Sequence, residues 1–94
     1  MYATVRRYEN AGALADAMTS KREDVQKLIS EVPGFVTYCA TREGDTITTV
    51  SIYNDKAGCD ESTRRAREWV GENVQGHLAP PEVSGGDAFL NFSK

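Results

Sequence analysis

The chain has 94 residues and a formal net charge of −3, with 14 acidic and 11 basic residues spread along its length. This size allows one modest core, so we expect residues 1–94 to form a single domain. No basic run could neutralise a series of phosphates, which argues against nucleic acid as a partner. No apolar stretch approaches the ~20 residues of a membrane span, and the start, MYATVRRYE, does not resemble a secretory signal. We therefore expect a cytoplasmic protein that binds neither nucleic acid nor membranes.

Two cysteines, Cys39 and Cys59, are expected to be free thiols, because a chain without a secretory signal belongs in a reducing compartment. Cys39 lies within a predicted strand, where it is expected to be buried as a small hydrophobe. The two cysteines are twenty residues apart, and the chain has a single His. The spacing therefore supports neither a metal site nor catalysis by a Cys nucleophile, and we expect no metal.

The first predicted elements are a strand and a long helix. Residues Met1–Glu9 alternate with period two, which places Tyr2, Thr4, Arg6 and Tyr8 on one face of a strand. Apolar residues then recur with period 3.6 through Ala13–Glu31 and predict one amphipathic helix, with an interruption at Lys21-Arg22. The apolar stripe consists of Leu14, Met18, Val25, Leu28, Ile29 and Val32.

A β-hairpin is predicted between Val32 and Asp55. Pro33-Gly34 ends the preceding helix, and two β-rich runs follow, Phe35–Arg42 and Thr46–Tyr53. Glu43-Gly44-Asp45 supplies the glycine-bearing connection that a short hairpin needs.

Both faces of this hairpin carry apolar side chains. In the first strand, simple alternation places Phe35, Thr37 and Cys39 on one face and Val36, Tyr38 and Ala40 on the other. In the second strand it places Ile47, Thr49 and Tyr53 on one face and Val50 and Ile52 on the other. A half-exposed antiparallel sheet normally has one polar face. Helices from this chain can cover only one face, so we expect the other face to be covered by a second copy, in a homodimer.

The rest of the chain predicts a second helix and a last strand. The helix is expected over Glu61–Leu78, with either Asp55 or Asp60 as its cap and Pro80-Pro81 after its end. The last strand is expected over Asp87–Phe92. The order β-α-β-β-α-β predicts an α+β, ferredoxin-like fold, with a four-stranded antiparallel sheet in the order 4-1-3-2 and two helices on one face.

The inner face of the second helix carries the strongest candidate for a ligand site. Trp69, Asn73 and His77 are spaced four apart, so they stack on one side of a helix and offer an aromatic wall with polar contacts. Arg6, Tyr38 and Tyr53 are the strand residues that can reach the same space. The alternative is structural: Trp69 as the main core aromatic, Asn73 as a partner of a backbone group, and His77 as a helix C-terminal cap.

Several stretches resemble the dimeric α/β-barrel superfamily, and within it the antibiotic-biosynthesis-monooxygenase-like domains. They are the segment EVPGF (Glu31–Phe35) before the hairpin and the A-x-x-W segment (Ala66–Trp69) in the second helix. The resemblance implies a homodimer with a pocket between each sheet and its helices. The catalytic proteins of this kind include monooxygenases that oxidise aromatic polyketide-type compounds with O2 and without metal or flavin. They also include relatives that degrade haem, so the resemblance implies one of these activities. The haem-degrading pattern needs an Asn on the first strand, where this chain has Thr4 and Arg6.

Two functional hypotheses follow from the residues and the resemblance. The first is a cofactor-independent monooxygenase for a small aromatic compound, with Trp69 and Asn73 as catalytic residues and Arg6, Tyr38, Tyr53 and His77 as ligand contacts. The second is a non-catalytic dimeric α/β barrel that binds a small ligand or has a structural role. A tightly packed inner helix face, without a cavity of roughly 300 Å3, favours the second hypothesis.

Overall fold

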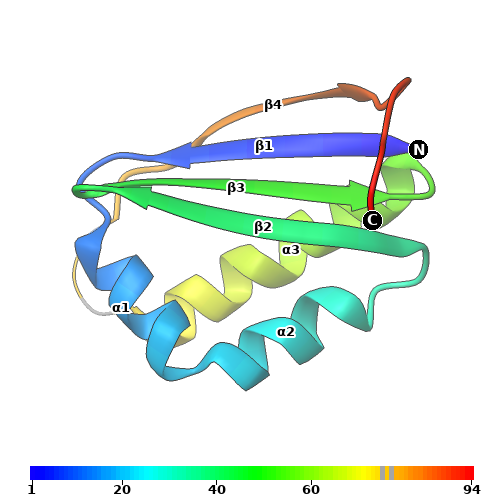
Figure 1. Ribbon diagram of the computed structural model, residues 1–94. Helices are drawn as coiled ribbons and strands as arrows, with labels where there is room; N and C mark the ends of the chain where they lie inside the picture. Colours follow the sequence, from blue (N-terminus) through cyan, green and yellow to red (C-terminus); the bar gives the residue numbers. More distant parts are fainter. Residues whose placement is uncertain (75, 77) are drawn as a thin grey trace.

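The computed structural model describes residues 1–74, 76 and 78–94, and it is an antiparallel four-stranded sheet with helices on one face (Figure 1). The elements are β1 Tyr2–Tyr8, α1 Gly12–Ser20, α2 Arg22–Ser30, β2 Phe35–Glu43, β3 Thr46–Tyr53, α3 Lys56–Asn73 and β4 Glu82–Asp87. The strand order is β2-β3-β1-β4, and every neighbouring pair is antiparallel. The predicted α+β ferredoxin-like fold and its strand order are therefore confirmed. None of the helices that the structure describes is long and apolar enough to cross a membrane.

The two central strands bury every second residue against the helices. Arg6 in β1 lies opposite Thr49 in β3, and Thr4 lies opposite Ser51. All four residues are buried, as is Tyr8. The predicted face of the first strand is correct, and it is the face that the helices cover.

Two apolar clusters form the core between sheet and helices. The first cluster consists of Tyr8, Ala11, Leu14, Ala15 and Ile47, with Met18, Trp69, Val70, Val74 and Leu78 packed against it. The second cluster consists of Ile29, Val32, Tyr53 and Cys59, with Tyr2, Val25, Phe35 and Tyr38 packed against it. Tyr53 anchors the second cluster, because its hydroxyl donates to the Ile29 carbonyl at 2.7 Å and its ring meets Phe35 edge to face.

The prediction of one long first helix is wrong, because the chain breaks at Lys21 into α1 and α2. Lys21 has φ −115° and ψ 37°, outside the helical range. A run of six polar residues, Thr19–Asp24, crosses the break and offers no apolar contact that would favour a continuous helix. Glu23 and Asp24 fall in the first turn of α2, where acidic side chains stabilise a helix N-terminus.

The last helix also differs from the prediction at both ends. It begins at Lys56, and the Asp55 carboxylate caps it by accepting from the Gly58 backbone N–H at 3.0 Å. It ends at Asn73, because Val74 is extended and packs with Leu78 on the first core cluster. The predicted continuation to Leu78 is therefore wrong, and His77 lies outside the described residues.

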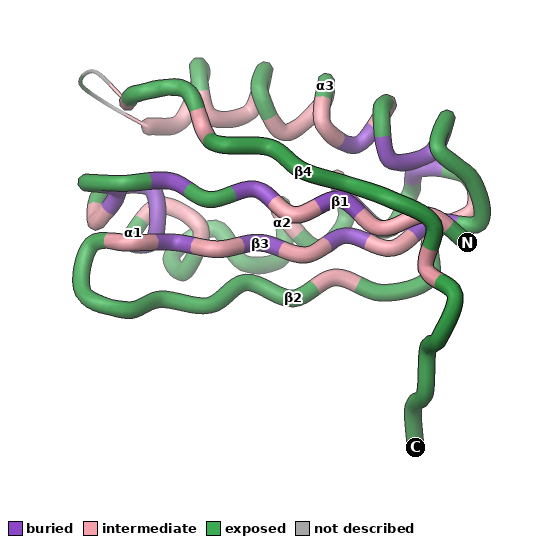
Figure 2. The backbone as a smooth tube through the Cα atoms, turned by 90° about the horizontal axis from the view of Figure 1, so that it is seen from above, coloured by how far each residue is buried: buried purple, intermediate pink, exposed green. Residues whose placement is uncertain are grey.

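The last strand lies earlier than predicted. β4 spans Glu82–Asp87, pairs with β1, and includes Ser84-Gly85-Gly86, which reads as a flexible linker by composition. A β-carbon on Gly85 would lie 2.9 Å from the Ala3 carbonyl oxygen, so this close approach of strands requires glycine. Residues 88–94 are not a strand, and Figure 2 shows them running past β2 and away from the sheet.

Two details of β2 correct the predicted faces of the hairpin. The pairing with β3 shifts between Phe35 and Thr37, so Phe35 and Tyr38 both pack against the second core cluster. A β-bulge of this kind breaks the simple alternation of faces. Cys39 pairs with Val50 on the sheet face that no helix covers, and it is exposed, contrary to the prediction of burial. The other cysteine, Cys59, is buried, and both thiols are free.

Candidate functional site

An inner cavity of about 30 Å3 lies between the sheet and the helices. Three strands and one helix each contribute a polar or aromatic side chain to it: Arg6 from β1, Tyr38 from β2, Thr49 from β3 and Trp69 from α3. The remaining lining is Tyr8, Leu14, Met18, Val25, Leu28, Ile29, Ala66 and Val70. A mostly apolar wall with a few convergent polar groups is typical of a ligand site.

Arg6 is the unusual member of this lining, because its charged side chain is only 2 % exposed. Its Nη2 donates to two neutral hydroxyls, Ser51 Oγ at 3.3 Å and Ser62 Oγ at 3.4 Å. Its Nε and the Thr49 Oγ1 are both buried without a hydrogen-bond partner among the described residues. None of the ion pairs found in that part of the chain includes Arg6. Arg6 is thus a buried cation that is held by neutral groups.

Tyr38 faces Arg6 as a neutral phenol. Burial raises the pKa of Tyr38 to about 12, although the nearby Arg6 charge acts in the opposite direction. At physiological pH the hydroxyl keeps its proton, so Tyr38 can donate a hydrogen bond but cannot balance the charge of Arg6.

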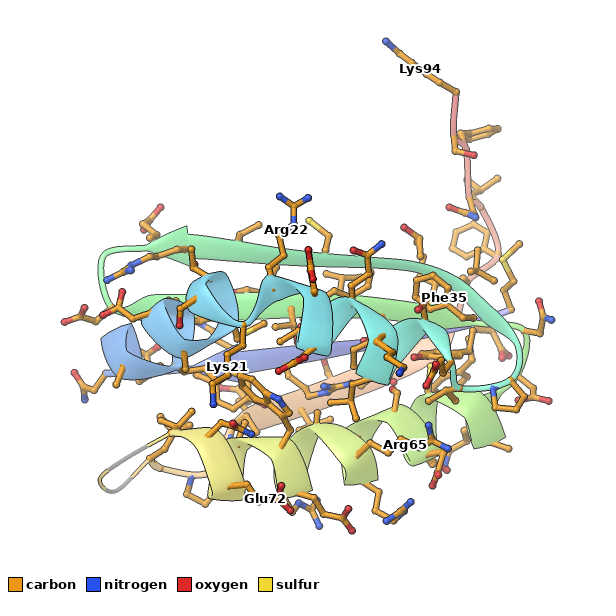
Figure 3. The ribbon with its side chains drawn as sticks, turned by 90° about the horizontal axis from the view of Figure 1, so that it is seen from below. Lys21, Arg22, Phe35, Arg65, Glu72 and Lys94 are labelled. Atoms are coloured by element: carbon orange, nitrogen blue, oxygen red, sulfur yellow. The ribbon has the colours of Figure 1, made fainter. Side chains whose placement is uncertain are left out.

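A larger groove of about 660 Å3 adjoins the cavity, between β2 and the helices α1 and α2. It shares Met18, Val25, Ile29 and Tyr38 with the cavity lining. Arg22 and Phe35 also line it, and Figure 3 shows them at the start of α2 and at the start of β2. Tyr38 therefore stands between the groove and the inner cavity.

A second groove of about 470 Å3 reaches Arg6 from the other side, between α3 and β4. It shares Arg6, Tyr8 and Val70 with the inner cavity, and Arg67 adds a second guanidinium to its lining. Arg6 thus lies where the inner cavity meets this more open space.

Of the residues that the sequence indicates, the structure brings Arg6, Tyr38 and Trp69 together around the inner cavity. Tyr53 is fully buried in the second core cluster, and its hydroxyl is engaged by the Ile29 carbonyl. Thr49 and Ser51, which lie beside Arg6, are not among the site residues predicted from the sequence. The signal for both is the register of the sheet, because β3 pairs with β1 and places them beside Arg6.

Asn73 lies at the end of α3, outside the linings of the three cavities. Its Nδ2 donates to the Trp69 carbonyl at 2.9 Å, and its Oδ1 accepts from Lys21 Nζ. Figure 3 shows Lys21 between α2 and the end of α3. Asn73 therefore ties the break between α1 and α2 to the turn that carries Trp69. The structure describes no group of three or more His, Cys, Asp or Glu residues that could hold a metal ion.

Comparison with solved structures identifies the fold. NE2512, a protein of unknown function from Nitrosomonas europaea, matches with a TM-score of 0.68 and 17 % identity, over 99 % of this chain and 93 % of that one. SnoaB, a cofactor-independent oxygenase from Streptomyces nogalater, matches with a TM-score of 0.64 and 16 % identity, over 99 % and 97 %. A monooxygenase from ActVA-Orf6 of Streptomyces coelicolor, in complex with Nanaomycin D, matches with a TM-score of 0.66 and 16 % identity, over 99 % and 91 %.

The fold is that of the antibiotic biosynthesis monooxygenase-like proteins. This agrees with the resemblance seen in the sequence. No protein-family model matches the chain, and no curated protein matches it either. At these identities the likeness concerns the antibiotic biosynthesis monooxygenase-like fold, and function has to be argued from the site.

Proposed function

We propose that the chain is a cofactor-independent monooxygenase that acts on a small aromatic compound. The observation that carries the proposal is the convergence of Arg6, Tyr38 and Trp69 on one cavity beside a groove of about 660 Å3. A groove of that volume is within the usual ~300–1,000 Å3 of ligand pockets. Proteins with the same fold include a cofactor-independent oxygenase and a monooxygenase that was crystallised with Nanaomycin D.

Each of these residues has a role that its environment supports. The Trp69 ring is an apolar wall of the inner cavity, and an aromatic substrate that enters past Tyr38 stacks against it once this small cavity widens. Arg6 stabilises negative charge on a substrate oxygen, and the neutral Tyr38 hydroxyl donates a hydrogen bond to the same group. Asn73 acts as a positioning residue, because it holds the turn of α3 that carries Trp69. His77 and Tyr53 stay predictions as ligand contacts.

The proposed chemistry balances without a separate reductant. A ring CH2 group activated by a carbonyl gives up a proton to water and becomes an electron-rich enolate, whose negative charge Arg6 stabilises. Transfer of electrons from this enolate to O2 lets one oxygen atom become a carbonyl on the same carbon. The other oxygen atom leaves as water, so CH2 and O2 give C=O and H2O, and the substrate supplies all four electrons.

Oxygen uptake with a panel of hydroxylated aromatic compounds, such as naphthols and anthrones, tests the proposal. We expect Trp69→Phe and Tyr38→Phe to lower the rate by about tenfold or more, because each removes a group that orients the substrate. Tyr2→Phe is the matched control, since Tyr2 is on the same strand as Arg6 but lines none of the three cavities. Uptake that is equal in all of these proteins would contradict the proposal.

The second candidate is a non-catalytic ligand-binding or structural protein. The observation in its favour is the inner cavity of about 30 Å3, roughly a tenth of the low end for ligand pockets. This candidate predicts no oxygen uptake with any compound of the panel. A change in Trp69 fluorescence without uptake would identify a binding protein. A hemin titration without a Soret shift would exclude haem as the ligand.

We also propose that the protein is a homodimer, joined through the sheet face that no helix covers. Val5, Val50 and Ile52 lie on this face and are only partly buried in one copy. Covering them in a second copy would remove apolar surface from water at roughly 25 cal/mol per Å2. Residues 88–94 extend beyond the sheet with Phe89 and Phe92 exposed, which also suits contact with a partner.

A further inference from the structure

Arg6 carries a buried positive charge without a charged partner among the described residues. The proposed oxygenase chemistry does not explain this charge in the protein without substrate. Charged side chains this deeply buried are normally paired with an opposite charge, because removing an ion from water is costly. Here the recorded partners of the guanidinium are the hydroxyls of Ser51 and Ser62, both at long distances. Ser62 Oγ itself donates to the Cys59 carbonyl, so it remains free to accept from Arg6. The site is therefore positively charged.

Within the described part of the chain, the tyrosines near Arg6 do not supply a negative charge. Burial raises the pKa of Tyr38 and also that of Tyr53, so both phenols stay neutral at physiological pH. Tyr8 also lines the inner cavity. The adjoining groove adds Arg67, a second positive charge.

Two buried donors line the same cavity, Arg6 Nε–H and the Thr49 hydroxyl, on neighbouring strands at paired positions. Neither has a hydrogen-bond partner of ordinary geometry among the described residues, although Tyr38 lies close enough to Thr49 for that hydroxyl to act on the Tyr38 pKa. The cavity of about 30 Å3 exceeds the roughly 10–15 Å3 that one water molecule needs in a protein interior, so it has room for a group of a few atoms. A small anion of a few atoms would accept from both donors and balance the charge in the same space.

We propose that Arg6 and Thr49 form a binding site for a small monovalent anion or for an ionised oxygen group of that size, reached through the groove between α3 and β4. This site does not depend on oxygenase activity. Arg67 lines this groove together with Arg6, and the two positive charges raise the local concentration of an anion there. The carboxylate of a larger molecule presents the same chemistry if its body stays in the groove.

Thermal unfolding of the full chain at constant ionic strength tests the site. Sodium formate, nitrate or bromide replaces sodium camphorsulfonate, whose anion is bulky and carries no carboxylate. We expect the Tm to rise by roughly 5–10 °C at about ten times the dissociation constant, because an anion that binds only the folded state stabilises it. Arg6→Met should remove this rise, whereas Arg7→Met should keep it. Arg7 is the neighbouring residue on the other face of β1, where it is exposed and paired with Glu9.

The same variants separate a binding site from a purely structural arginine. With camphorsulfonate as the only anion, Arg6→Met should unfold at the same temperature as the wild type or higher, because the methionine removes an unbalanced buried charge. A Tm rise that is equal in Arg6→Met, or absent in the wild type, would overturn the proposal.

A second readout does not depend on any variant. Trp69 is the only tryptophan and lines the same cavity, so bromide should quench its emission with a saturable curve in the wild type. Strictly linear quenching would contradict a defined site. Formate and benzoate identify the source of the anionic group. Tighter binding of formate supports a free small anion, and tighter binding of benzoate supports a carboxylate carried on a larger ligand.

Discussion

Tyr38 is the residue whose environment gives the clearest dependence on pH. Its pKa is about 12 in the folded protein against an ordinary value of 10.0, mainly because burial disfavours the phenolate. Between pH 10 and 12 the folded state therefore holds more protons than the unfolded state. The free energy of unfolding should fall as pH rises through this window.

Tyr38→Phe removes this contribution and serves as the test. Urea unfolding at pH 9, 10, 11 and 12 should show a smaller loss of stability in the variant, by up to about 2 kcal/mol at pH 12. An identical loss in both proteins would mean that Tyr38 is not desolvated in the folded state.

Gly58 offers a second test at the scale of one residue. A β-carbon at this position would lie 2.9 Å from Cβ of Tyr53 and 3.0 Å from its ring. Tyr53 is fully buried and hydrogen-bonded to Ile29, so it has little room to move. We expect Gly58→Ala to lower the free energy of unfolding by about 1–3 kcal/mol, despite the better helix propensity of alanine.

Gly71 is the matched control in the same helix, because a β-carbon there meets nothing within 4 Å. Gly71→Ala should therefore stabilise the protein, by about 0.5–1 kcal/mol. Chemical denaturation of both variants measures the difference. Equal effects of the two substitutions would show that Tyr53 does not pack against α3 as described.

At the scale of elements, the start of α3 distinguishes two caps that the sequence alone leaves open. The Asp55 carboxylate accepts from the Gly58 N–H, whereas Asp60 lies inside the helix and pairs with exposed Lys56. Asp55→Ala should cost about 1 kcal/mol, as loss of an N-cap typically does. Asp60→Ala should change stability by less than about 0.5 kcal/mol, since exposed ion pairs contribute little. A larger effect at Asp60, measured by urea denaturation, would assign the cap to that residue.

The elements also show which parts of the fold can be predicted from this sequence. The strands and turn of the hairpin agree with the prediction because the turn residues and the two β-rich runs act locally, whereas the β-bulge between Phe35 and Thr37, which changes the faces of β2, was missed. The break at Lys21, the early end of α3 and the position of β4 were missed because tertiary contacts decide them. Val74 leaves the helix to pack on the core, and β4 is placed by pairing with β1 at a glycine.

The site was predicted in part for the same reason. Period-two alternation placed Arg6 with Tyr8 on one face, and helical periodicity placed Trp69 inward, so both were found. Tyr38 lies beside them only because β2 pairs with β3 in the observed register. That Arg6 lacks a charged partner among the described residues is visible only in three dimensions, since 56 positions separate it from Ser62 along the chain.

At the scale of the whole molecule, one sheet face and the last seven residues carry the case for a second subunit. Phe89 is 89 % exposed and Phe92 is 87 % exposed, and no described element of the same chain covers them. A single copy gains nothing from two exposed phenylalanines, whereas burial against a partner would stabilise each by roughly 1.5–3 kcal/mol. The tail runs away from its own sheet, and Figure 3 shows Lys94 far from the helices.

Truncation of the chain after Asp87 tests this assignment. Removal of residues 88–94 should weaken the homodimer by about tenfold or more in dissociation constant, because both phenylalanines leave the interface. The control removes only Ser93 and Lys94, which keeps Phe89 and Phe92 and should leave the dimer unchanged. Sedimentation equilibrium at micromolar concentration measures all three proteins. A full-length chain that sediments as a monomer would refute the homodimer, and a truncated chain that dimerises as well as the control would confine the interface to the sheet.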